Sequence, residues 1–158
     1  MSDNDLKDKI DTRALDALYK SLKENKLVVR VGVLGGKNAR KGSGPSNAEI
    51  GAAHEFGTTN LPVRSFLRMP LSEQLPKELE KEGIFNEKDI NAIIKEESLR
   101  KFANKIGVIA VRTVLMAFDT TGFGTWKESN MDFKKTKQTL VESHQLRDSI
   151  TYDVKVKK

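Results

Sequence analysis

The sequence contains no cysteine, and its 158 residues include only two histidines and one tryptophan. The absence of cysteine excludes disulfide bonds, thiolate metal ligands and cysteine nucleophiles. Neither His54 nor His144 has a second histidine at metal-binding spacing, so we expect no metal site and no cofactor. His54 precedes Glu55, but adjacent helical residues point about 100° apart. We therefore expect no acid–base pair there and predict that the protein is not an enzyme.

Long hydrophobic runs are also missing. No apolar stretch approaches the roughly 20 residues that a membrane span requires. Residues 1–6 are polar and acidic, whereas a secretory signal starts with basic residues and continues with apolar ones. We expect folding in a cytoplasm and no membrane partner. Hydrophobic residues make up 37% and charged residues 32%, which favours a single domain over residues 1–158.

The net charge of +6 is concentrated in two stretches. Residues 27–70 carry six basic and two acidic side chains, residues 119–158 carry eight and six, and the rest of the chain is balanced. Lys37, Arg40 and Lys41 fall in a glycine-rich part of the first stretch. Basic groups on a loop attract phosphate or acidic protein surfaces. A solvated loop without a partner is the simpler interpretation.

Helical periodicity appears in several segments. In the N-terminal segment 1–26 it predicts a helix over residues 5–24. Its apolar positions recur three or four residues apart and are Leu6, Ile10, Ala14, Ala17, Leu18 and Leu22. The longest pattern covers residues 87–118, and its second half, 106–118, is apolar nearly all round and should lie deepest in the core. Residues 70–82 also favour a helix, with a kink or a later start caused by Pro76.

A shorter helix is indicated by Ser46 and Glu49, which match a capping box. It should start at Asn47, continue towards Phe56 and end at Gly57. We expect Phe56, like Phe66 and Leu67 further along the chain, to pack in the core.

Strands are predicted at two places by alternation of apolar and polar residues, namely residues 27–34 and 150–157. Residues 35–46 and 119–139 are polar and rich in small residues, and we expect both to be mobile loops. The fold class is therefore α+β, with a small antiparallel sheet packed against two or three helices and long mobile loops.

Two segments together resemble a known family. Residues 52–58 read Ala-Ala-His-Glu-Phe-Gly-Thr, and residues 61–68 read Leu-Pro-Val-Arg-Ser-Phe-Leu-Arg. They resemble the "hEFGT … iPaRpFLr" stretch of phage tail-completion and virion-morphogenesis proteins. Trp126 and residues 140–152 are similar to the closing part of that family, so the resemblance covers roughly residues 28–156.

Two positions depart from the family pattern. Ser65 stands where the family usually has proline, and Ser143-His144 stands where it usually has Thr-Gly. Serine can still cap a helix, but histidine lacks the freedom of glycine to adopt a positive φ. The departures therefore bear mainly on the local turn geometry.

The resemblance implies a structural protein at the junction between the tail tube and the head connector, forming a homo-oligomeric ring. Its partners would be other phage neck and tail subunits. Its location would be the virion, after assembly in the host cytoplasm. The strand at 150–157 could be completed by a strand from another chain, with its lysines preventing premature pairing. Our candidate partner-binding residues are all basic: Lys37, Arg40, Lys41, Arg64, Arg68, Lys155 and Lys157.

The alternative is a basic nucleic-acid-binding accessory protein. The positive net charge favours it, but neither a recognition helix nor an aromatic platform for stacking bases is evident.

Overall fold

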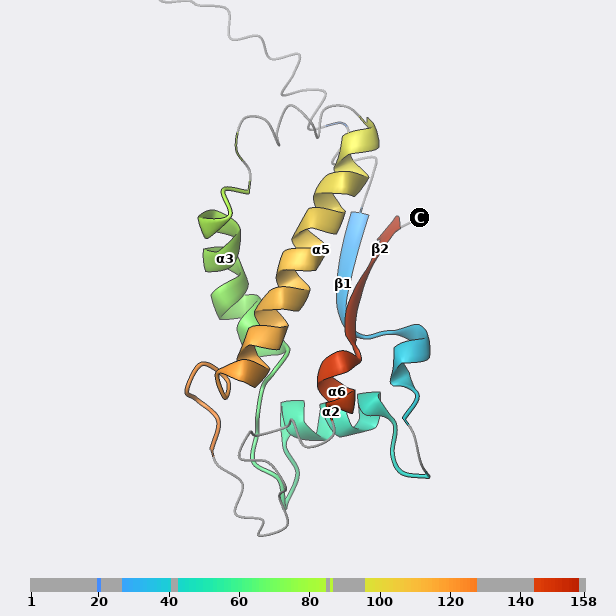
Figure 1. Ribbon diagram of the computed structural model, residues 1–158, viewed down its shortest axis with the longest axis vertical. Coiled ribbons are helices and arrows are strands. Elements are labelled where there is room, and N and C mark those ends of the chain that lie inside the picture. Colours follow the sequence, from blue (N-terminus) through green and yellow to red (C-terminus); the bar gives the residue numbers. More distant parts are fainter. Residues whose placement is uncertain are drawn as a thin grey trace, which may run out of the picture.

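The protein is α+β, with a two-stranded antiparallel sheet packed against three main helices (Figure 1). A computed structural model describes residues 20, 27–40, 43–84, 86, 96–127 and 144–156. The fold class predicted from the sequence is confirmed. The predicted N-terminal helix lies outside these residues, apart from Lys20.

The sheet joins the two segments that alternate in sequence. Strand β1 (Leu27–Val33) pairs with β2 (Ile150–Val156), with Leu27 opposite Val156 and Val33 opposite Ile150. In β1 the odd-numbered residues are partly buried, whereas Val28 and Arg30 are exposed. Both strands therefore form as predicted, because a strand directs alternate side chains to opposite faces.

Helix α5 (Glu96–Asp119) packs along one face of this sheet (Figure 1). Its buried side is deepest between Ile109 and Phe118, as predicted. Burial is nevertheless confined to one side of α5 in this part, since Val108 is 56% exposed and Arg112 is also exposed. The helix begins at Glu96, and residues 87–95 of the predicted helix lie outside the described residues.

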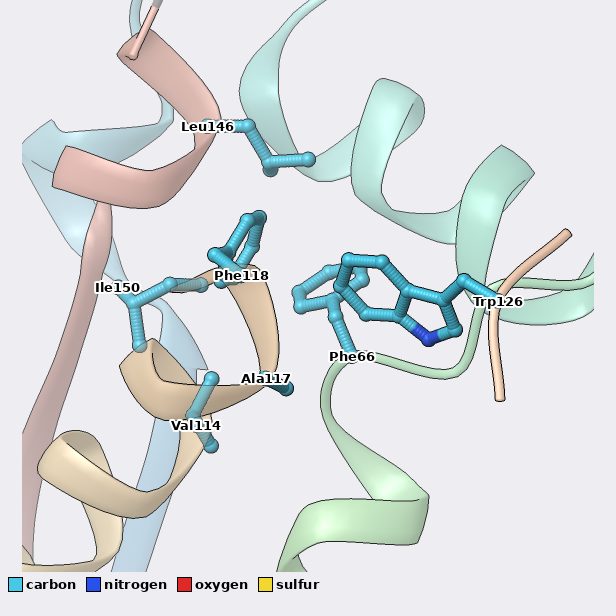
Figure 2. Close-up of a cluster of buried hydrophobic side chains, with 7 residues drawn as sticks. All are labelled: Phe66, Val114, Ala117, Phe118, Trp126, Leu146 and Ile150. Atoms are coloured by element: carbon cyan, nitrogen blue, oxygen red, sulfur yellow. The ribbon is translucent and has the colours of Figure 1, made fainter. Parts of the chain in front are cut away.

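The hydrophobic core gathers side chains that are far apart in sequence (Figure 2). The rings of Phe66 and Phe118 have centroids 5.2 Å apart, and Phe118 meets Trp126 edge-on at 5.9 Å. Such tilted and edge-on arrangements are favoured by the charge distribution of aromatic rings. The cluster consists of Phe66, Val114, Ala117, Phe118, Trp126, Leu146 and Ile150.

Helix α2 (Asn47–Phe56) lies across one end of the sheet, next to the short helix α6 (Gln145–Asp148) (Figure 1). The predicted capping box is present, because Ser46 and Glu49 each bind the backbone N–H of the other. Gly57 ends the helix with φ at +75°, a conformation that glycine adopts without strain. The bounds predicted for α2 are thus confirmed.

The segment after Met69 contains a distortion that Pro76 explains. Residues Pro70–Gln74 form the π-helical turn η2, and α3 (Leu75–Lys81) follows directly. Proline has no N–H and its ring clashes with the carbonyl four residues earlier. A wider turn before Pro76 accommodates both effects, and the N–H of Leu75 bonds to the carbonyl of Pro70.

The glycine-rich stretch is partly ordered against α2. Residues Gly35–Asn38 form the 3-10 turn η1. The side chain of Asn38 accepts a hydrogen bond from the N–H of Ala48 at 2.8 Å, and Asn47 donates to the carbonyl of Lys37 at 2.9 Å. These bonds attach residues 35–40 to the start of α2. Residues 119–127 are also held in place, since the N–H of Gly122 donates to the carbonyl of Ala117 at 2.6 Å and Trp126 packs in the core. Mobility in 41–46 and 128–139 stays a prediction, and residues 41–42 and 128–139 lie outside the described residues.

One core assignment is wrong. Phe66 is buried and Leu67 packs against the core, but Phe56 is 64% exposed. The cause is helical phase, because Gly51 and Glu55 occupy the inward face of α2 and Phe56 follows on the outward face.

Candidate functional site

The carboxylate of Glu55 connects the two segments of the family resemblance. It lies at the end of α2 and is almost fully buried. It accepts hydrogen bonds from the Ser65 hydroxyl at 2.7 Å, from the N–H of Leu67 at 2.9 Å and from the N–H of Arg68 at 3.0 Å. The guanidinium of Arg68 donates to the same carboxylate at 2.9 Å. One side chain of α2 thus fixes the conformation of the following loop.

The ionisation of Glu55 reflects this environment. Burial raises the pKa of Glu55, but hydrogen bonds from Ser65, from the backbone at Leu67 and Arg68, and from the Arg68 side chain outweigh it. The pKa of Glu55 therefore lies below its ordinary value. A carboxylate that accepts several hydrogen bonds is stabilised in its charged form, so Glu55 is suited to holding the loop.

Arg64 holds the same loop through different partners. Its side chain is 2% exposed, and its guanidinium donates to the carbonyl of Lys127 from Nε at 3.3 Å and from Nη2 at 3.2 Å. Its N–H donates to the carbonyl of His54 at 2.7 Å. Burial lowers the pKa of Arg64. This residue therefore joins α2, the loop and the segment after α5, and in the isolated chain it is not a surface residue.

An exposed apolar surface lies next to this fixed loop. Phe56 is 64% exposed and Val63 is 57% exposed, and the guanidinium of Arg68 lies 4.7 Å from the centre of the Phe56 ring. The side chain of Arg68 is itself 62% exposed. Aromatic residues and arginine contribute much of the binding energy at protein interfaces, and here the two side chains lie together on the surface.

A groove of about 240 Å³ adjoins Phe56. Its lining is mostly apolar and comes from the end of β1, from α2 and from the loop: Val33, Ala48, Gly51, Ala52, Glu55, Phe56, Phe66, Leu67 and Arg68. The exposed residues Ala48, Ala52 and Phe56 are four residues apart and share one face of α2. This face, with the groove, is called the α2 groove below.

A second, larger cavity of about 520 Å³ lies between η1, the start of α2 and α6. Lys37 and Arg40 line it on one side, and Asp148 and Gln145 line it on the other. The guanidinium of Arg40 donates to the side chain of Asn47 at 3.1 Å. The cavity therefore offers cationic groups beside a carboxylate.

The structure brings together only some of the basic residues predicted to bind a partner. Lys37 and Arg40 line one cavity, whereas Arg68 lines the α2 groove. Lys155 is exposed at the other end of the sheet, opposite Val28. Lys41 and Lys157 lie outside the described residues.

Arg64 was predicted from the sequence to bind a partner, but in the structure it is buried. It was a candidate contact residue because arginine is common at interfaces, but its guanidinium is used inside the protein. Sequence analysis also missed the part played by Glu55, which it considered only as a neighbour of His54. The signal was a carboxylate at the end of a helix, a few residues before a loop with two arginines.

Two further features concern the described residues only. No helix among them combines the length and apolar character needed to cross a membrane. Nor do three or more of their histidine and carboxylate side chains gather where a metal ion would be held.

Comparison of the chain with protein-family models, with curated proteins and with solved structures found no match.

Proposed function

We propose that the protein is a structural subunit of a tailed bacteriophage that acts in tail completion or head–tail joining by docking as a ring subunit at the neck. Its partners would be tail-tube and head-connector subunits together with further copies of itself. It would act by assembly, without converting a substrate.

One observation carries this proposal. The segments that resemble the phage family, residues 52–58, residues 61–68 and the closing part with Trp126, pack against one another. Glu55 of the first segment binds Ser65, Leu67 and Arg68 of the second. The neighbouring Phe66 packs in the cluster with Trp126. The closing segment contributes Leu146 and Ile150 to the same cluster (Figure 2). Residues that must pack together constrain one another, which supports a real family likeness over a chance match of short motifs.

The exposed surfaces also suit assembly. The α2 groove presents Phe56, the last residue of α2, beside Arg68 on the loop that Glu55 holds in place, and a preorganised surface loses little conformational entropy on binding. Strands β1 and β2 form a sheet of two, so within the described residues each has an edge that pairs with no further strand. Edges of this kind can accept a strand from another chain.

The proposal is tested by electron microscopy of particles produced without this chain. We expect separate heads and tails, or tails of abnormal length, and we expect normal particles when the gene is supplied in trans. Complete infectious particles in the absence of the chain would overturn the proposal.

A basic nucleic-acid-binding protein remains the second candidate, because Lys37 and Arg40 line one cavity. The other described basic residues of 27–70 are used differently. Arg30 is paired with Asp153, and Arg64 is buried. Arg68 is paired with Glu55. Among the described residues of 27–70, the positive charge that remains is that of Lys37 and Arg40, and it lies beside the carboxylate of Asp148, which would repel phosphate.

A salt titration separates the two candidates. Affinity for DNA that depends on several phosphate contacts falls about 1000-fold or more between 50 and 200 mM salt. We expect no binding of this strength to duplex or single-stranded DNA. Submicromolar DNA binding with a steep salt dependence would favour the second candidate.

A further inference from the structure

The chain leaves α5 through a turn of unusual backbone conformation. Its four central residues all have φ in the left-handed region, at +51° for Thr121, +66° for Gly122, +56° for Phe123 and +82° for Gly124. Residues normally visit this region singly, and a side chain with a Cβ does so at a cost. For a β-branched residue such as Thr121 a positive φ is a strong outlier. The turn therefore contains two strained positions among four.

Local hydrogen bonds and one large ring hold this turn closed. The N–H of Gly122 donates to the carbonyl of Ala117. The N–H of Trp126 donates to the carbonyl of Thr121 at 3.1 Å. The indole ring of Trp126 lies directly on Gly122, where an added Cβ would overlap it. The same ring meets Phe118 edge-on (Figure 2). These interactions all join residues that are close in the chain.

Two buried polar groups at the end of the turn are incompletely paired. The indole Nε1 of Trp126 has no hydrogen-bond partner among the described residues. Arg64 binds the carbonyl of Lys127, but no carboxylate in the described part of the chain pairs with its buried charge. A buried donor without an acceptor and a buried charge without a counter-ion each cost free energy, which contact with water would recover.

We propose that residues 120–127, called the clasp below, open as one unit while α5 and the sheet remain folded. The strained backbone of Thr121 and Phe123 and the unpaired Nε1 of Trp126 all belong to the clasp, so opening relieves these costs together. The costs offset part of what the local hydrogen bonds and the burial of Trp126 contribute. The clasp therefore opens at a lower free energy than the whole fold, in line with the frequency of strained backbone in segments that switch.

Opening changes the surface of the protein beside the core. Trp126 packs against Phe118 in the cluster that also contains Phe66 (Figure 2). Release of the clasp uncovers these apolar rings and separates Lys127 from the guanidinium of Arg64. The closed form thus hides an apolar surface with one cation beside it, and the open form exposes it. The inference goes beyond the proposed function, since it concerns the isolated chain and requires no virion.

The test uses two full-length variants that change the clasp in opposite directions. Thr121→Asn keeps the turn but lowers its strain, because asparagine adopts a positive φ more readily than threonine. Gly122→Ala places a Cβ in the indole ring of Trp126 and should hold the clasp open. Thr59→Asn is the matched control, at an exposed turn position outside the clasp whose φ is not positive.

Native-state hydrogen exchange in low urea compares the clasp with Val114, which is fully buried in α5. In the wild type, the N–H groups of Gly122 and Trp126 should exchange roughly 100-fold or more faster than that of Val114. Their exchange should depend little on urea, because local opening exposes little surface. Thr121→Asn should slow their exchange about fivefold, whereas Thr59→Asn should leave it unchanged.

Fluorescence of Trp126, the only tryptophan, gives an independent readout. In Gly122→Ala we expect its emission to shift to the red and to become open to quenching by acrylamide, while Val114 keeps its slow exchange. The proposal is overturned if the wild-type clasp shares the exchange rate and urea dependence of Val114, or if Thr121→Asn fails to slow exchange in the clasp. It is also overturned if Gly122→Ala leaves Trp126 as shielded as in the wild type, or removes the slow exchange of Val114.

Discussion

The ring of Tyr152 in β2 lies directly against the backbone of α5 at Gly107, where an added Cβ would overlap the ring. In an exposed helix, replacing glycine by alanine stabilises by about 1 kcal/mol. Here we expect Gly107→Ala to lower the free energy of unfolding by about 1–3 kcal/mol, because α5 and the sheet must move apart. Urea denaturation measures the change. In a Tyr152→Ala background the same substitution should cost little, and an equal cost in both backgrounds would contradict this packing.

Glu55 should make stability depend on pH in the acidic range. Its pKa is lowered in the folded protein from an ordinary value near 4.5. The unfolded chain therefore takes up a proton first as the pH falls. The stabilisation from Glu55 is present above about pH 4.5 and is lost as the pH falls through the lower folded pKa. Denaturation between pH 7 and pH 3 should show this loss.

The matched variant is Glu55→Gln. Glutamine cannot titrate, and its amide group would turn N–H groups towards the donors of the loop. We expect a loss of about 2–3 kcal/mol at pH 7. The difference from the wild type should shrink as the pH falls below 4.5. A difference that is the same at pH 7 and pH 3 would show that the charge of Glu55 does not hold the loop.

His144 occupies a strained backbone position. Its φ is +56°, in the left-handed region that side chains with a Cβ adopt at a cost of about 1 kcal/mol. We predict that His144→Gly raises the melting temperature by about 2–4 °C. His144→Ala is the control, because it retains the Cβ and should bring no gain. Equal effects of glycine and alanine would mean that the side chain matters and the backbone does not.

Changes at Lys37 test whether the cavity beside η1 contacts a partner. Deleting residues 37–44 should reduce head–tail joining, but it would also remove the hydrogen bond that the N–H of Ala48 donates to the side chain of Asn38. The substitution Lys37→Glu is cleaner, since Asn47 donates to the backbone carbonyl of Lys37, which the substitution leaves in place. We expect an unchanged melting temperature and at least a tenfold drop in joined particles. Wild-type joining by both variants would exclude a role for this loop.

Much of the fold follows from local sequence patterns. Alternation located both strands, and Ser46, Glu49 and Gly57 fixed the ends of α2, because caps and turns depend on residues that are neighbours in the chain.

The missed features all depend on contacts between distant residues. The burial of Arg64 requires the carbonyl of Lys127, which is 63 positions away. The exposure of Phe56 depends on which face of α2 the core selects. The sequence indicated that the turn at His144 would be unusual, since the family that the chain resembles usually has glycine there. The positive φ of His144 could be established only from the folded backbone. The part played by Glu55 likewise appears only once the loop is folded onto α2.

Restoration of joining by the purified protein tests the central claim most directly. Extracts that contain heads and tails but lack this chain would be mixed with the wild-type protein or with buffer, and infectious particles would be counted. We predict that the protein raises the titre by several orders of magnitude and that Glu55→Ala, which frees the loop, restores far less. A titre that stays at the buffer level, in an extract whose heads and tails do join when a lysate of wild-type phage is added, would contradict the account.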